Sequence, residues 1–88
     1  MPTVHREEGF SFLVYTHDHE PPHIHVFKGG AEAQIALGTE AKGPSILDPM
    51  QMAPTDLRRA FRIIEANRSA LMLSWRKYHA EMEIPDGR

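Results

Sequence analysis

Four of the six histidines of this chain lie within nine residues, in the segment His17-Asp18-His19-Glu20-Pro21-Pro22-His23-Ile24-His25. An imidazole takes up and releases a proton near neutral pH, so two imidazoles flanking a phosphate group can act as general base and general acid. Imidazole nitrogens are also common ligands of zinc, nickel and copper. The segment therefore predicts an acid–base site or a transition-metal site. If the histidines neither catalyse a reaction nor bind a metal, the segment is a solvated polar surface.

The acid–base interpretation assigns catalysis to His19, His23 and His25 and needs no cofactor. Its substrate-binding candidates are Arg6, Lys28 and Gln34, of which the two cations would hold a phosphate group. The metal interpretation uses the same three histidines as ligands of zinc or another transition metal, and it leaves one coordination position for water. Their spacing matches no standard zinc signature, so both interpretations stay open at this point.

A two-residue turn positions two of these histidines. The segments 23–28 and 31–37 alternate in polarity and flank Gly29-Gly30, a pair typical of a tight hairpin turn. This turn length places Ile24 opposite Ile35 and His25 opposite Gln34. One face of the hairpin is then apolar, and the other carries His23 and His25, which we expect to face solvent.

The rest of the chain supplies a small α+β domain. Segments 3–6 and 10–15 predict a second hairpin, and 45–47 is a candidate for a short edge strand. From residue 54 to 79 apolar residues recur at steps of three and four, which predicts one helix or two with a bend near Asn67. We therefore expect a single domain over residues 1–88: a mostly antiparallel four-stranded sheet over about 3–47, one or two C-terminal helices over about 54–79 packed on one face, and a frayed tail over 80–88.

Composition excludes several classes of protein. The chain has no cysteine, so it has no disulfide, thiolate zinc site or cysteine nucleophile. Its apolar runs are too short to span a membrane, and its start lacks the regions of a signal peptide, so we expect a cytoplasmic protein. Residues 55–79 carry six basic and two acidic residues, whereas residues 1–54 carry three basic and seven acidic ones. The basic segment is either a solvated helix face or the contact surface of an anionic partner.

The motifs of the chain resemble a small prokaryotic family known as domain of unknown function four-one-six-zero. The resemblance rests on Pro2-Thr3-Val4, Arg6, Gly9-Phe10, the block from His19 to Val26 (HEPPHIHV), Lys28-Gly29-Gly30, and the helical segment from Leu57 to His79. It covers residues 2–79. The positions that match the family's motif include Arg6, His19, Glu20, His23, His25 and Lys28, whereas His17 departs from it.

The resemblance implies a short α+β protein that acts as the toxin half of a toxin–antitoxin pair. Its expected partner is a small antitoxin-like protein encoded nearby, and the chain could also form a homodimer. Joined to the histidine cluster, the resemblance predicts a toxin-like, metal-independent ribonuclease that acts on RNA. The alternative is a non-enzymatic metal-binding or protein-binding module that uses the same histidine face.

Overall fold

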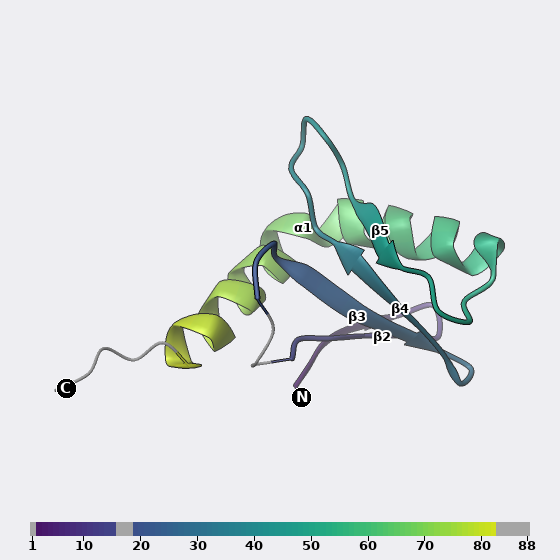
Figure 1. The fold of residues 1–88 in the computed structure, drawn as a ribbon, viewed down its shortest axis with the longest axis horizontal. Helices are drawn as coiled ribbons and strands as arrows, with labels where there is room; N and C mark the ends of the chain where they lie inside the picture. Colours follow the sequence, from purple (N-terminus) through teal and green to yellow (C-terminus); the bar gives the residue numbers. More distant parts are fainter. Residues whose placement is uncertain (1, 16–18, 83–88) are drawn as a thin grey trace, which may run out of the picture.

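The computed structural model describes residues 2–15 and 19–82, which form an antiparallel sheet followed by one helix (Figure 1). The strands are β1 (Thr3–Glu7), β2 (Phe10–Leu13), β3 (His23–Lys28), β4 (Ala31–Ala36) and β5 (Ser45–Asp48), and the helix is α1 (Pro54–Met82). The order of the strands across the sheet is their order along the chain. The α+β architecture is confirmed.

The sheet has five strands, and the prediction of four was wrong. The fifth strand is β5, which pairs antiparallel with β4 and places Ile46 opposite Ile35. This pairing satisfies the backbone groups along the outer edge of β4, which a four-stranded sheet would leave without ladder partners. Sequence patterning gave a weak signal here because all four residues of β5 are exposed.

The predicted register of the β3–β4 hairpin is confirmed. Ile24 pairs with Ile35, His25 with Gln34, and Lys28 with Ala31, on either side of the turn. Gly29 and Gly30 adopt φ angles of 54° and 86°, the left-handed conformations that this type of turn requires. The alternation of residues along β3 therefore places Ile24 on one face of the sheet and its neighbours His23 and His25 on the other.

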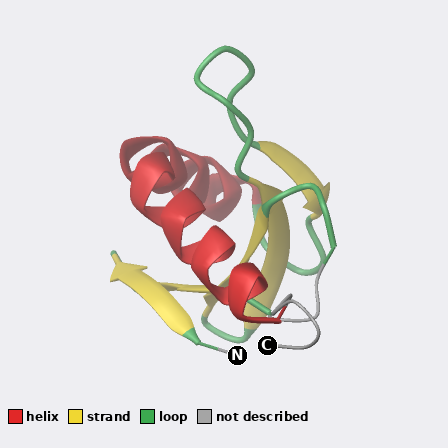
Figure 2. Cartoon of the chain, turned by 90° about the vertical axis from the view of Figure 1, so that its left-hand side faces the viewer, coloured by secondary structure: helices red, strands yellow, loops and turns green. Residues whose placement is uncertain are grey.

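Helix α1 crosses the apolar face of the sheet and changes direction at Asn67 (Figures 1 and 2). The backbone of Asn67 is non-helical, with φ −122° and ψ 16°. Its side-chain Nδ2 donates to the Ile63 carbonyl at 2.8 Å and lies 3.4 Å from Oε1 of Glu7 on β1. The helical region is therefore one helix with a kink, and Asn67 ties the kink to the edge of the sheet.

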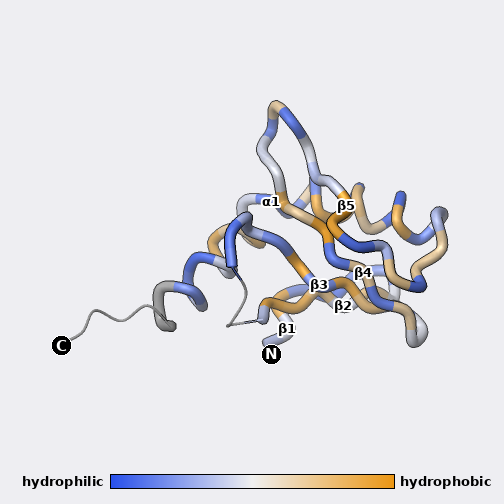
Figure 3. The backbone as a smooth tube through the Cα atoms, in the orientation of Figure 1, coloured by the Kyte–Doolittle hydropathy of each residue, from blue (hydrophilic) through white to orange (hydrophobic). Residues whose placement is uncertain are grey.

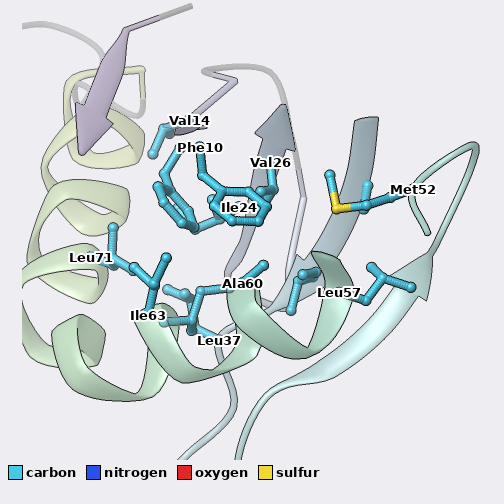
Figure 4. Close-up of a cluster of buried hydrophobic side chains, with 14 of the residues drawn as sticks. Phe10, Val14, Ile24, Val26, Leu37, Met52, Leu57, Ala60, Ile63 and Leu71 are labelled. Carbon is cyan, nitrogen blue, oxygen red and sulfur yellow. The ribbon is translucent and has the colours of Figure 1, made fainter. Parts of the chain in front are cut away.

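The core lies between α1 and the apolar face of the sheet (Figure 4). Hydrophobic residues gather in the central strands and recur along the helix (Figure 3). The fully buried side chains with the largest volumes are Phe10, Phe12, Ile24, Ile35, Leu37, Ile64, Val14 and Val26. Their burial supplies the main driving force for docking the helix onto the sheet.

The helix extends to Met82, three residues beyond the predicted helical region. The remainder of the predicted tail, 83–88, lies outside the described residues. Within the described part of the chain, no helical segment combines the length and apolar composition that a bilayer-spanning helix needs.

Candidate functional site

His23 and His25 lie side by side on the sheet face that points away from α1, which we call the histidine face. Their ring centroids are 5.3 Å apart. The expectation that this pair faces solvent was wrong, because His23 is 8% exposed and His25 is 4% exposed. One cause is Tyr15, which lies two residues after the end of β2. Its ring stacks on the ring of His25, with 3.6 Å between the centroids and 16° between the planes.

A carboxylate orients the ring of His25. Nδ1 of His25 lies 3.2 Å from Oε2 of Glu32 on β4. An ionised carboxylate only accepts hydrogen bonds, so Nδ1 is the donor and the neutral ring carries its lone pair on Nε2. Gln34, the third predicted substrate-binding residue, is the direct neighbour of His25 across the β3–β4 pair. Glu32 thus fixes the tautomer of His25 as the acidic residue of a catalytic triad fixes its histidine.

A backbone carbonyl orients the ring of His23. Nδ1 of His23 lies 2.8 Å from the carbonyl oxygen of Pro21. A carbonyl oxygen can only accept, so this ring also has its proton on Nδ1 and, when neutral, its lone pair on Nε2. The two neighbouring imidazoles therefore share one tautomer, each set by a separate acceptor. A pair prepared in this way can divide the base and acid roles of a proton-transfer reaction.

The structure does not assemble the predicted metal site within the residues it describes. His19 is an exposed residue of the loop before β3. Across 2–15 and 19–82, no three His, Asp or Glu side chains lie close enough together to hold a metal ion. His17 and Asp18, which neighbour His19, lie outside the described residues.

Of the two predicted phosphate-binding cations, Lys28 does not join the histidine pair. Lys28 lies four residues after Ile24 on β3, and alternate residues of a strand point to opposite faces. Its side chain therefore lies on the apolar face of the sheet with Ile24, opposite the histidine face. There its Nζ donates to the Glu8 carbonyl at 3.0 Å and lies 4.6 Å from the centroid of the Phe10 ring. Arg6 is exposed on the edge strand β1, two strands away from β3. Lys28 is thus occupied in holding the β1–β2 turn.

A pocket that sequence reasoning missed lies beside the start of β3 and has a volume of about 740 Å³. We call it the cationic pocket. Its lining comes from the loop before β3, the end of β4, the β4–β5 loop, β5 and the second half of α1: Pro21, Pro22, Ala36, Gly38, Thr39, Lys42, Gly43, Ser45, Leu47, Met72 and Arg76. Two of these residues contact His23, since Pro21 accepts its hydrogen bond and Ala36 is its partner in the sheet. His23 therefore stands directly behind the wall of the pocket.

Two cations that the sequence analysis did not select, Lys42 and Arg76, line this pocket. They are 34 positions apart in the sequence, and only the docking of α1 against the β4–β5 loop brings them to one pocket. The excess of basic residues in 55–79 indicated that this segment could bind an anionic partner, but it could not show which arginine lines the pocket.

Comparison with known proteins gives a family and no characterised relative. No curated protein matches the chain, and no solved structure matches it. A family model described as Domain of unknown function (DUF4160) matches residues 9–76, which include β2, β3, β4, β5 and most of α1. By this match over most of its length, the chain belongs to the DUF4160 family.

Proposed function

We propose that this protein is a toxin-like ribonuclease that cleaves RNA by acid–base chemistry at His23 and His25 without a metal ion. The observation that carries the proposal is the adjacent imidazole pair, in which Glu32 and the Pro21 carbonyl hold both rings in the same tautomer. The corresponding partner is a small antitoxin-like protein that covers the active surface.

In the proposed reaction, Nε2 of His25 removes the proton of a ribose 2′-hydroxyl, and the 2′-oxygen attacks the adjacent phosphorus. The bond from phosphorus to the 5′-oxygen breaks, and His23 in its protonated form gives its proton to that oxygen. The products are a 2′,3′-cyclic phosphate and a 5′-hydroxyl. We assign the base to His25 because the Glu32 carboxylate complements the positive charge that the ring gains.

Burial of the pair favours a second candidate function, a binding module without catalysis. At 8% and 4% exposure, His23 and His25 resemble supporting residues that hold Pro21 and Tyr15 in place. In this case the chain binds its partner through the surrounding surface. The histidines then affect stability and not turnover.

Expression of the isolated protein distinguishes the two functions. We expect growth arrest and RNA fragments with cyclic phosphate ends from the wild type. We expect a loss of about 10²–10⁴-fold in cleavage rate from His23→Gln or His25→Gln. His5→Gln is the matched control, because His5 lies near Phe12 on the opposite face of the sheet.

A chelator should leave the cleavage rate unchanged, since the proposed chemistry uses no metal. Equal arrest from all variants at matched protein levels would show that the histidines do not carry the reaction. Absence of arrest and of cleavage from the folded wild type would leave the binding module as the better interpretation.

A further inference from the structure

The positive charge of the cationic pocket continues into a neighbouring pocket of about 420 Å³. The two pockets share Gly38, Thr39, Met72 and Arg76, so they adjoin each other, and we call them together the cationic groove. Lys42 lines only the larger pocket, Arg68 lines only the smaller one, and Arg76 lines both. Three cations are therefore distributed along the groove.

The charged side chains that line the groove are mainly basic. None of the described residues that line either pocket is Asp or Glu. Glu40 and Glu65 line a neighbouring pocket of about 290 Å³, which shares Arg68 and Ser69 with the groove. Oε2 of Glu65 lies 3.8 Å from the position of a Cβ at Gly43, so one carboxylate stands at the edge of the groove. A groove with three cations along its length and one carboxylate at its edge keeps an excess of positive charge, which attracts a ligand with several negative charges.

Arg68 is held in position by the sheet. Its Nε donates to the carbonyl oxygen of Leu37 at 3.0 Å, a contact between residues 31 positions apart. This bond uses one of the five guanidinium N–H groups and anchors the cation at the end of β4. Fixing the guanidinium before a ligand arrives reduces the side-chain entropy that binding would cost.

The wall of the groove also has an apolar part. Pro22, Leu47 and Met72 line the larger pocket, and Leu47 is 46% exposed although it is a large hydrophobic residue. The hydroxyl-bearing residues Thr39 and Ser45 line the same pocket. Apolar surface beside cations and hydroxyls suits a ligand that combines a flat base with a sugar–phosphate backbone.

We propose that the cationic groove binds a segment of single-stranded RNA, with phosphates at Lys42, Arg76 and Arg68 and a base against Pro22, Leu47 and Met72. A base inside a duplex is stacked and cannot reach such a wall, so the ligand is single-stranded. The inference rests on the proposed function, because it identifies the groove as the place that holds the substrate next to His23.

The test measures binding separately from cleavage. The probe is a short fluorescein-labelled single-stranded RNA with 2′-O-methyl groups, which cannot be cleaved because its 2′-oxygens carry no proton. Fluorescence anisotropy gives its affinity for the full chain. We expect Lys42→Ala and Arg76→Ala to weaken binding about fivefold each, and the double variant about 25-fold.

The matched control is Arg62→Ala, an exposed arginine of the same helix that does not line the groove. It should change the affinity less than about twofold. Each groove variant should also make the slope of the logarithm of the association constant against the logarithm of the salt concentration less negative by about 0.7, because one cation fewer contacts the phosphates. Thermal unfolding of every variant shows that the fold is retained.

Three results would overturn the proposal: equal affinities of the Lys42, Arg76 and Arg62 variants, an abasic probe that binds as tightly as the RNA, or a poly-glutamate peptide that competes equally well for the groove. The last result would indicate an acidic protein ligand. His25→Gln separates this proposal from the proposed function. It should slow cleavage by about 10²–10⁴-fold and leave binding of the probe unchanged, because His25 bonds to Glu32, which does not line the groove. If the wild type binds the probe but cleaves no RNA, the groove is supported and the catalytic proposal fails.

Discussion

The contact between His25 and Glu32 gives the sharpest test of the arrangement of the histidine face. His25 is 4% exposed, and the Glu32 side chain is 23% exposed. A hydrogen bond to a charged group contributes about 1.5–3 kcal/mol, and a neutral one contributes about 0.5–1.5 kcal/mol. Glu32→Gln keeps an acceptor oxygen and loses the charge, so it should lower the free energy of unfolding by about 1 kcal/mol.

Glu32→Ala removes the acceptor as well and leaves the buried Nδ1 of His25 without its carboxylate. This variant should lose about 2 kcal/mol. For a domain of this size, 1 kcal/mol corresponds to about 4–8 °C in melting temperature. We therefore expect Glu32→Ala to melt lower by roughly twice the shift of Glu32→Gln.

Thermal and urea unfolding followed by circular dichroism measure both shifts. The matched control is Glu20→Gln, the same chemical change at an exposed loop residue. If both Glu32 variants melt together with the Glu20 control, the carboxylate does not hold His25 in solution, and the assignment of His25 as the base loses its support.

Two further predictions concern the elements that shape the groove. Asn67→Ala should cost about 1 kcal/mol, because it removes the 2.8 Å hydrogen bond to the Ile63 carbonyl at the kink, and a lower urea midpoint would show this; an unchanged midpoint would mean that the side chain does not support the kink. Gly38→Ala should cost at least about 1 kcal/mol more than Gly30→Ala. Both glycines have positive φ, but a Cβ at Gly38 would collide with the Gly43 carbonyl, whereas no atom lies within 4 Å of a Cβ at Gly30. Melting temperatures compare the two variants, and equal costs would argue against the close approach of the loop ends.

Sequence patterning predicted the parts of the fold that depend on neighbouring residues. The Gly29-Gly30 turn and the alternation of polarity were enough to fix every pair of the β3–β4 hairpin. The same alternation also placed Lys28 with Ile24, on the face away from the histidines, and this signal could have excluded Lys28 from the site. Closeness of cations and histidines along the chain is thus weaker evidence for a shared site than the alternation of residues along a strand, which shows the face on which each side chain lies.

The features that sequence could not predict arise from contacts between distant segments. Burial of His23 and His25 depends on side chains from other parts of the sheet: Tyr15, which follows β2, and Glu32 on β4. The cationic groove exists only after α1 packs beside the β4–β5 loop and brings Arg76 to Lys42. Neither arrangement leaves a periodic pattern in the sequence.

The meander order of the strands has a consequence for how the protein assembles. Each strand pairs only with the strand that precedes or follows it in the chain, so the sheet needs no long crossover connection. This low contact order favours rapid formation of the sheet. By contrast, the bonds from Asn67 to Glu7 and from Arg68 to Leu37 span 60 and 31 positions and form only when the helix docks. We therefore expect the groove between helix and sheet to be the last part of the molecule to form and the first to exchange its amide hydrogens in the native state.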